Sequence, residues 1–192
     1  MRNFELAPEI IREYDIRGIV GKTLFPENAK QIGLAIGTRA KREGKGRVVI
    51  AYDGRLTSEE LAENLIAGLV ATGVAVTNLG CGPSPMLYYG QKHYDYDYGI
   101  MITGSHNPPE YNGFKICCNK KGIYGDEIKK IAAEITQANF AEGQGTEEKI
   151  DLKEEYAERM VKDLNINKEM RIAWDPANGS GAEICKMLAQ LI

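Results

Sequence analysis

A serine that follows a buried strand is the strongest candidate for chemistry in this chain. Ser105 lies in the segment TGSHNPPEYNGFK, residues 103–115, at the end of the apolar run GIMIT. In open α/β sheets, ligands bind beyond the carboxyl ends of the strands, so a reaction is expected at this loop. Gly104 allows a tight turn beside the serine, and Pro108 and Pro109 restrict the backbone that follows. The segment therefore predicts a stiff polar loop that holds the Ser105 hydroxyl in place.

The hydroxyl of Ser105 needs an activating group, because a free serine is a weak nucleophile. His106 is adjacent in the sequence, and Lys115 lies one hairpin away. The chain has two histidines and no G-x-S-x-G segment, so the triad of a serine hydrolase fits poorly. The residues alone leave two interpretations open for Ser105: a nucleophile, or a structural turn serine with a capping role.

Alternating apolar runs and amphipathic segments predict the elements that position this loop. Repeated strand–helix alternation favours a three-layer α/β/α domain with a mixed, mostly parallel sheet. Thr57 and Glu60 have the spacing of a capping box. Residues 141–149, AEGQGTEEK, are expected to be a flexible polar linker. The expected strands are 11–19, 48–52, 74–79, 99–103 and 114–118, and the expected helices are 26–42, 58–73, 86–92, 126–140 and 152–163.

The strand–helix pattern starts again near the C-terminus. We place one domain at residues 1–165 and the truncated start of a second α/β domain at residues 166–192. Residues 171–175, RIAWD, predict a strand, and AEICKMLAQLI, after a Gly-rich turn, predicts a helix. One strand and one helix cannot bury their apolar faces alone. We therefore expect these faces to pack on missing C-terminal domains of the same protein, to self-associate, or to stay mobile.

The composition limits the classes of partner. The 192 residues carry a net charge of −3, which argues against a nucleic-acid partner because proteins that grip phosphates of nucleic acids carry a basic surplus. The four cysteines form no C-x-x-C pair and are expected to be reduced thiols. No apolar run approaches the ~20 residues of a membrane helix, and the N-terminus lacks the apolar core of a signal peptide. We expect a cytoplasmic protein without a membrane partner.

Two separate segments carry a resemblance to a known family. TGSHNPPEYNGFK is similar to the phosphoserine loop of the α-D-phosphohexomutase superfamily, and EYDIRG, residues 13–18, is similar to its N-terminal signature. AYDGR, residues 51–55, and WDPANGSG also fit, so the resemblance covers essentially the whole chain. Phosphoglucosamine mutases typically have GTDGIRG and an SASHNP-type loop. This chain is therefore more similar to the bacterial phosphomannomutase/phosphoglucomutase group.

The resemblance implies an isomerase that interconverts hexose 1-phosphate and hexose 6-phosphate, with mannose, glucose or both as the sugar. Ser105 matches the serine that carries phosphate, donates it to the substrate and takes the other phosphate back from the bisphosphate intermediate. An activator of the glucose 1,6-bisphosphate type is also implied. This chain would be the N-terminal part of such an enzyme and inactive alone. A non-enzymatic phosphate-binding module is the alternative.

The resemblance also assigns two cations to the phosphate. Lys115 and Arg17 match the charged positions beside the phosphoserine, where fixed cations stabilise the negative charge of a transferring phosphoryl group. Each has a simpler interpretation. Lys115 at the start of a strand could be a solvated charge, and Arg17 could form a structural ion pair with Glu13, Asp15 or Asp53.

Three further positions follow from the same resemblance. His106 matches a catalytic loop position near the phosphate, and Asn107 and Tyr14 match positions that contact substrate. Tyr14 could also be a half-buried aromatic residue. Asp53 and Arg55, after a strand and before a helix, could either support the site or form a salt bridge that braces the loop.

The family binds Mg²⁺ through the phosphoserine and three aspartates of a D-G-D-x-D-R loop in its second domain. The chain contains no such segment. Ser105, through its phosphate, is the one metal ligand that the resemblance assigns here, and one phosphate oxygen would not hold Mg²⁺ tightly because the ion favours octahedral oxygen coordination.

Overall fold

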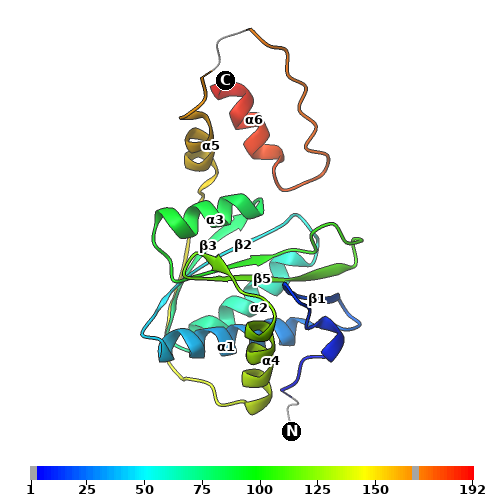
Figure 1. Cartoon of the computed structure of the whole chain (residues 1–192), viewed down its shortest axis with the longest axis vertical. Coiled ribbons are helices and arrows are strands. Elements are labelled where there is room, and N and C mark those ends of the chain that lie inside the picture. Colours follow the sequence, from blue (N-terminus) through cyan, green and yellow to red (C-terminus); the bar gives the residue numbers. More distant parts are fainter. Residues whose placement is uncertain (1–3, 166–168) are drawn as a thin grey trace.

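A mixed sheet forms the centre of the computed structural model, which describes residues 4–165 and 169–192 (Figure 1). The sheet order is β1-β5-β4-β2-β3-β7, with β6 paired to β5. Strands β4, β2, β3 and β7 are parallel, whereas β1, β5 and β6 pair antiparallel with their neighbours. The mixed sheet expected from the sequence is confirmed. Its strands are β1 (Ile16–Ile19), β2 (Arg47–Tyr52), β3 (Ala75–Cys81), β4 (Tyr98–Ile102), β5 (Tyr111–Cys118), β6 (Lys121–Gly122) and β7 (Thr146–Lys149).

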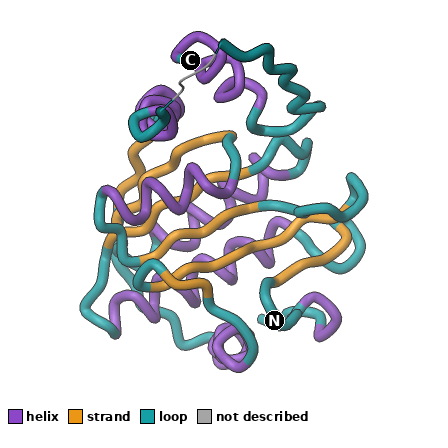
Figure 2. Tube along the Cα trace, turned by 45° about the horizontal axis from the view of Figure 1, so that its top comes forward, coloured by secondary structure: helices purple, strands orange, loops and turns teal. Residues whose placement is uncertain are grey.

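Helices cover both faces of the sheet, which confirms the three-layer α/β/α architecture. Helices α1, α2 and α4 lie on one face and α3 on the other, as Figures 1 and 2 show from two directions. Helices α5 and α6 lie on the α3 side, farther from the sheet (Figure 1). The helices are α1 (Pro26–Arg42), α2 (Ser58–Val70), α3 (Ser84–His93), α4 (Asp126–Gln137), α5 (Lys153–Val161) and α6 (Ala182–Leu191), and a 3-10 turn spans Pro8–Ile10.

The alternation of side chains along β5 decides which of its residues can reach the site. Phe114 and Ile116 are buried in the larger core, which the sheet forms with α1, α2 and α4. Because successive side chains of a strand point to opposite faces, Lys115 lies on the other face. Met101, its partner on β4, belongs to the smaller core on the α3 side.

Two local expectations near the sheet were wrong. Thr57 makes no side-chain cap to α2; its hydroxyl instead accepts a hydrogen bond from Asn112 Nδ2 at 3.0 Å. The expected linker at 141–149 contains β7, which pairs in parallel with β3. The Thr77 hydroxyl donates to Glu148 at 2.7 Å across this pair, so the polar residues form a hydrogen-bonded edge strand.

The C-terminal segment also differs from its expectation. Residues 171–175 form no strand, and Ile172 and Trp174 are 50% and 42% exposed. Helix α6 forms as expected, but Ile184 and Leu188 are buried with residues of α3 and α5, so its apolar face has partners within this chain. The domain boundary at 165/166 adjoins residues 166–168, which lie outside the described residues, and it stays a prediction. Across the described ranges, no helix is long and apolar enough to span a membrane.

Candidate active site

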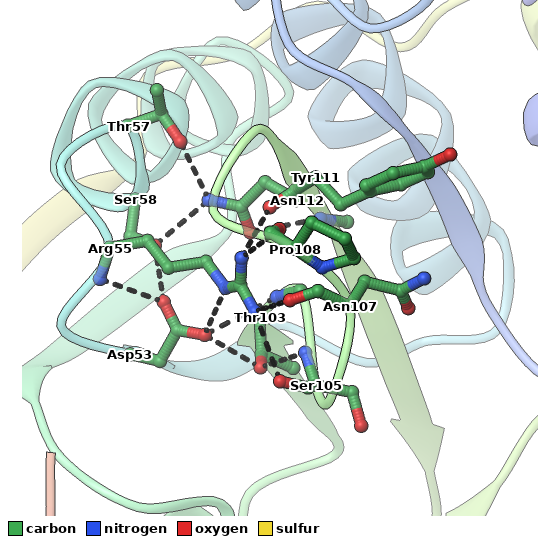
Figure 3. Close-up of polar contacts among 12 residues, drawn as sticks. Asp53, Arg55, Thr57, Ser58, Thr103, Ser105, Asn107, Pro108, Tyr111 and Asn112 are labelled. Carbon is green, nitrogen blue, oxygen red and sulfur yellow. Dashed lines mark hydrogen bonds and ion pairs between the residues drawn. The ribbon is translucent and has the colours of Figure 1, made fainter. Parts of the chain in front are cut away.

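The loop that carries Ser105 leaves β4 at the carboxyl edge of the sheet and returns into β5. Ser105 is exposed, and its φ of 54° lies in the left-handed region. This backbone conformation costs a residue with a side chain about 1–2 kcal/mol, so its surroundings must hold it. Figure 3 shows the Ser105 hydroxyl pointing away from the polar contacts that fix the loop backbone.

The guanidinium of Arg55 fixes this loop by donating hydrogen bonds to backbone carbonyl groups of the loop (Figure 3). Nη1 donates hydrogen bonds to the carbonyl oxygens of Pro108 and Tyr111, at 2.6 and 3.0 Å. Nη2 donates to the carbonyl oxygens of Ser105 and Asn107, at 3.0 and 2.7 Å. One side chain thus ties together four points of the loop.

The carboxylate of Asp53 holds Arg55 and the start of the loop at once. Its two oxygens accept from Thr103 Oγ1 (2.8 Å), Gly104 N (3.3 Å), Arg55 Nε (3.2 Å), Arg55 N (3.1 Å) and Ser58 Oγ (2.6 Å). The Thr103 hydroxyl in turn accepts from the Ser105 amide at 2.8 Å. We call Asp53 and Arg55 the loop brace. The sequence left two interpretations of Asp53 and Arg55 open, support of the site or a salt bridge that braces the loop. In the structure both apply, because the salt bridge holds the loop that carries the candidate nucleophile.

Asn112 connects the end of the loop to the start of α2, and the sequence did not indicate it. Its side chain is fully buried, and Nδ2 donates to Ser58 Oγ at 2.9 Å as well as to Thr57. Because Ser58 also donates to Asp53, the chain of hydrogen bonds runs from the end of the loop to the loop brace.

Two cations lie on neighbouring strands and share one carboxylate. Arg17 on β1 pairs opposite Gly113 on β5, so Lys115 is two residues along on the adjacent strand. Asp15 Oδ2 accepts from Lys115 Nζ at 3.1 Å and from Arg17 Nη2. Arg17 Nη1 also donates to the side-chain oxygen of Asn107, which ties this cation to the serine loop.

Asp15, Arg17 and Lys115 form a cluster in which the carboxylate is buried and the cations are partly exposed. Asp15 is only 4% exposed, whereas the side chains of Arg17 and Lys115 are 17% and 29% exposed. Two cations and one carboxylate leave a net positive charge on the exposed side. The alternative of an Arg17–Asp15 ion pair is thus confirmed, and the pair holds Arg17 beside Lys115. Asp15 lies in EYDIRG, but the sequence named it only as a partner for Arg17.

Two of the expected site residues have no contact with this network. His106 is exposed, and within residues 4–165 and 169–192 it forms no hydrogen bond or ion pair. Tyr14 is 70% exposed, so the alternative of a half-buried aromatic residue was wrong. Its ring lies 6.4 Å from the ring of Tyr124, another exposed tyrosine.

A cleft of about 800 Å³ opens beside the serine loop. Ser105, Asn107 and Arg55 line one part of it, and Asn178, Gly179 and Ser180 of the turn before α6 line another. The cleft therefore joins the serine loop to the C-terminal segment, which the sequence had assigned to a second domain.

The described residues do not form a Mg²⁺ site. Among them, no group of three or more histidine, cysteine, aspartate or glutamate residues could hold a metal ion. Both oxygens of Asp53 are already engaged by donors of Arg55, of the serine loop and of Ser58 on α2. A phosphate on Ser105 would supply oxygen ligands, but the other ligands of an octahedral ion are not among these residues.

A match to a family model shows to which protein family the chain belongs. The model described as phosphoglucomutase/phosphomannomutase, alpha/beta/alpha domain I, matches residues 8–142. The chain belongs to this family. The match contains Arg17, Lys115 and the whole serine loop.

Individual relatives agree with this assignment. A phosphomannomutase/phosphoglucomutase of Pseudomonas aeruginosa is 38% identical over 97% of this chain and 40% of its own length. A phosphoglucomutase of Neisseria meningitidis is 39% identical over 92% of this chain and 39% of its own. The crystal structure of a phosphoglucomutase/phosphomannomutase family protein from Burkholderia thailandensis superimposes with a TM-score of 0.90 at 37% identity, covering 96% of this chain and 42% of that one. The chain thus spans about 40% of the length of the curated relatives it matches.

Proposed function

We propose that this chain carries the phosphoserine of a cytoplasmic phosphohexomutase, with Ser105 as the residue that exchanges phosphate with substrate. The substrates are the 1- and 6-phosphates of glucose, mannose or both. The observation that carries the proposal is the conformation of Ser105: a strained, exposed serine at the carboxyl edge of the sheet, held by the loop brace. Family membership supports the same role.

The reaction needs two phosphoryl transfers at one serine. In the first, the bond between phosphorus and Ser105 Oγ breaks while a substrate hydroxyl bonds to phosphorus. The proton of that hydroxyl ends on Ser105 Oγ, which gives a sugar bisphosphate and a free serine hydroxyl. In the second, Ser105 Oγ bonds to the other phosphate of this intermediate while the bond from that phosphorus to the sugar oxygen breaks. The serine proton ends on this sugar oxygen, and the isomeric monophosphate leaves. Arg17 and Lys115 stabilise the charge on the transferring group. His106, Asn107 and Tyr14 contact the phosphate or the sugar.

Mg²⁺ and a bisphosphate activator complete the proposal. The carboxylate ligands of the metal come from a part of the protein outside this chain. A compound such as glucose 1,6-bisphosphate restores the phosphate on an unmodified Ser105.

Phosphate incorporation tests the role of Ser105. The full-length protein that contains this chain is incubated with glucose 1,6-bisphosphate, and its intact mass and the modified peptide are measured. We expect one added phosphate, located on Ser105 and absent in Ser105→Ala. Phosphate on another residue would refute the assignment. Binding of sugar phosphates without any phosphate on Ser105 would instead support a non-enzymatic binding module.

A further inference from the structure

We propose that Arg55 is a positioning residue for phosphoryl transfer, which sets the direction of the Ser105 hydroxyl without touching the phosphate. This inference rests on the proposed function of Ser105. In this proposal, Arg17 on β1 and Lys115 on β5 contact the phosphate. The guanidinium of Arg55 instead holds the backbone that carries the nucleophile.

The donors of Arg55 are fully used within the protein. A guanidinium has five N–H groups in a fixed planar fork. Nε donates to Asp53, Nη1 to the carbonyl oxygens of Pro108 and Tyr111, and Nη2 to those of Ser105 and Asn107. No N–H of Arg55 remains for a phosphate. A lysine has only three donors around one point charge, so it cannot reproduce this pattern.

The charge of Arg55 is also neutralised where it lies. Asp53 and Arg55 form an ion pair, and their side chains are 17% and 16% exposed. Because the pair has no net charge, it attracts the dianionic phosphate much less than an unpaired cation would. This distinguishes Arg55 from Arg17 and Lys115, which share a single carboxylate between them.

Most of the backbone near Ser105 is already committed to contacts within the loop and with Asp53. The amides of Gly104, Ser105 and Asn107 donate to Asp53 Oδ2, Thr103 Oγ1 and the Gly104 carbonyl oxygen, respectively. Pro108 and Pro109 have no N–H. The amides of His106 and Glu110 donate to no other described group. The loop therefore keeps few amides that could contact an anion, and the conformation of Ser105 sets where its phosphate lies relative to Arg17 and Lys115.

That conformation depends on Arg55. The Ser105 carbonyl oxygen is one of its four acceptors, and the Ser105 φ of 54° is unfavourable for a residue with a side chain. Without the guanidinium, four carbonyl groups lose a shared donor and the peptide around Ser105 can relax. A displacement of about 1 Å of a reacting group can lower a rate about 100-fold.

Substitution of Arg55 in the full-length protein tests this role. The variants are Arg55→Gln and Arg55→Lys, with Arg42→Gln and Arg42→Lys as matched controls, because Arg42 also donates to a backbone carbonyl, that of Asn139 at 3.0 Å. The measurements are the single-turnover rate of Ser105 phosphorylation from glucose 1,6-bisphosphate, kcat, KM and the melting temperature. We expect Arg55→Gln to lower the phosphorylation rate and kcat about 100-fold or more, with KM nearly unchanged. For Arg55→Lys, the phosphorylation rate and kcat should lie between those of the wild type and those of Arg55→Gln. For the Arg42 variants, both rates should equal those of the wild type.

Chemical rescue separates positioning from a loss of folding. Arg55→Ala is assayed below its melting temperature with added guanidinium or methylammonium at non-denaturing concentrations. We expect guanidinium, which restores the planar donors, to raise kcat at least several-fold, and methylammonium to have no such effect. Wild-type kcat in Arg55→Gln, a rise in KM alone, or a loss of rate that only follows the unfolded fraction would overturn the proposal. If wild-type Ser105 takes up no phosphate, the proposed function itself fails, a result distinct from each of these.

Discussion

Replacement of Gly104 by alanine gives a direct test of how tightly the loop brace is packed. A Cβ at this position would lie 2.4 Å from both Cζ and Nε of Arg55 and 2.6 Å from the carbonyl oxygen of Tyr111. Carbon atoms do not approach other atoms so closely, and the Tyr111 carbonyl belongs to the backbone of β5. We therefore expect Arg55 to be displaced from the loop in Gly104→Ala.

The cost of this displacement follows from the hydrogen bonds that are lost. Arg55 makes four hydrogen bonds to loop carbonyls and one to Asp53 through its side chain, which is 16% exposed, so water replaces them only in part. Hydrogen bonds to charged groups contribute about 1.5–3 kcal/mol each. The loss of two without replacement lowers the free energy of unfolding by roughly 3–6 kcal/mol, a large part of the 5–15 kcal/mol typical of a domain.

Thermal unfolding measures this effect. For a protein of this size, 1 kcal/mol corresponds to roughly 2–4 °C, so we expect the melting temperature to fall by roughly 6–24 °C. Gly122→Ala is the matched control, because a Cβ at that exposed position meets nothing within 4 Å, and it should change stability by less than about 0.5 kcal/mol. A Gly104→Ala protein that melts within 2 °C of the wild type would refute the reasoning, since the loop would then accept the methyl group without losing Arg55.

Two other predictions concern different parts of the molecule. In the full-length protein, Arg17→Ala and Lys115→Ala should each lower kcat on the order of 100-fold or more and change KM less, because cations that act on transition-state charge have this kinetic signature; a changed KM with unchanged kcat would show binding alone. Hydrogen bonds from Tyr94 and Tyr89 lower the pKa of Glu155 on α5. A lowered pKa in the folded state stabilises the protein above the ordinary glutamate pKa of about 4.3, and this stability is lost as pH falls through the folded value. Urea unfolding should therefore show Glu155→Gln as less stable than wild type at pH 7, with a difference that shrinks on acidification below pH ~4; a constant difference would contradict this origin.

The sequence was most informative where a local pattern is sufficient to define the structure. The apolar run at 99–103 predicted β4, Pro26 predicted the start of α1, and TGSHNPPEYNGFK predicted the serine loop. Strand β7 was missed because TEEK has neither an apolar face nor alternation. It forms because the edge of β3 presents polar side chains, such as Thr77, to its glutamates.

Contacts between distant segments account for the other differences. Thr57 has the right spacing for a capping box, but buried Asn112, 55 residues away, needs an acceptor and uses its hydroxyl. Residues 171–175 have the composition of a strand, yet a strand requires a partner edge and none of the described strands pairs with them. Within the site, the sequence indicated Asp53 and Arg55 but could not show that Arg55 reaches four carbonyl groups.

The two arginines of the site differ in how many of their N–H groups remain without an acceptor. Every N–H of Arg55 is bound within the loop brace, so this cation is committed to the backbone. Lys115 has three N–H groups and, among the described residues, a single acceptor, Asp15. Arg17 uses one hydrogen bond on each Nη, to Asn107 and Asp15, and each Nη carries a second N–H. Arg17 and Lys115 therefore keep the capacity to bind a phosphate oxygen without giving up their existing contacts. Since Arg17 is also bound to Asn107 of the serine loop, a change in the loop brace that moves the loop should move this cation as well.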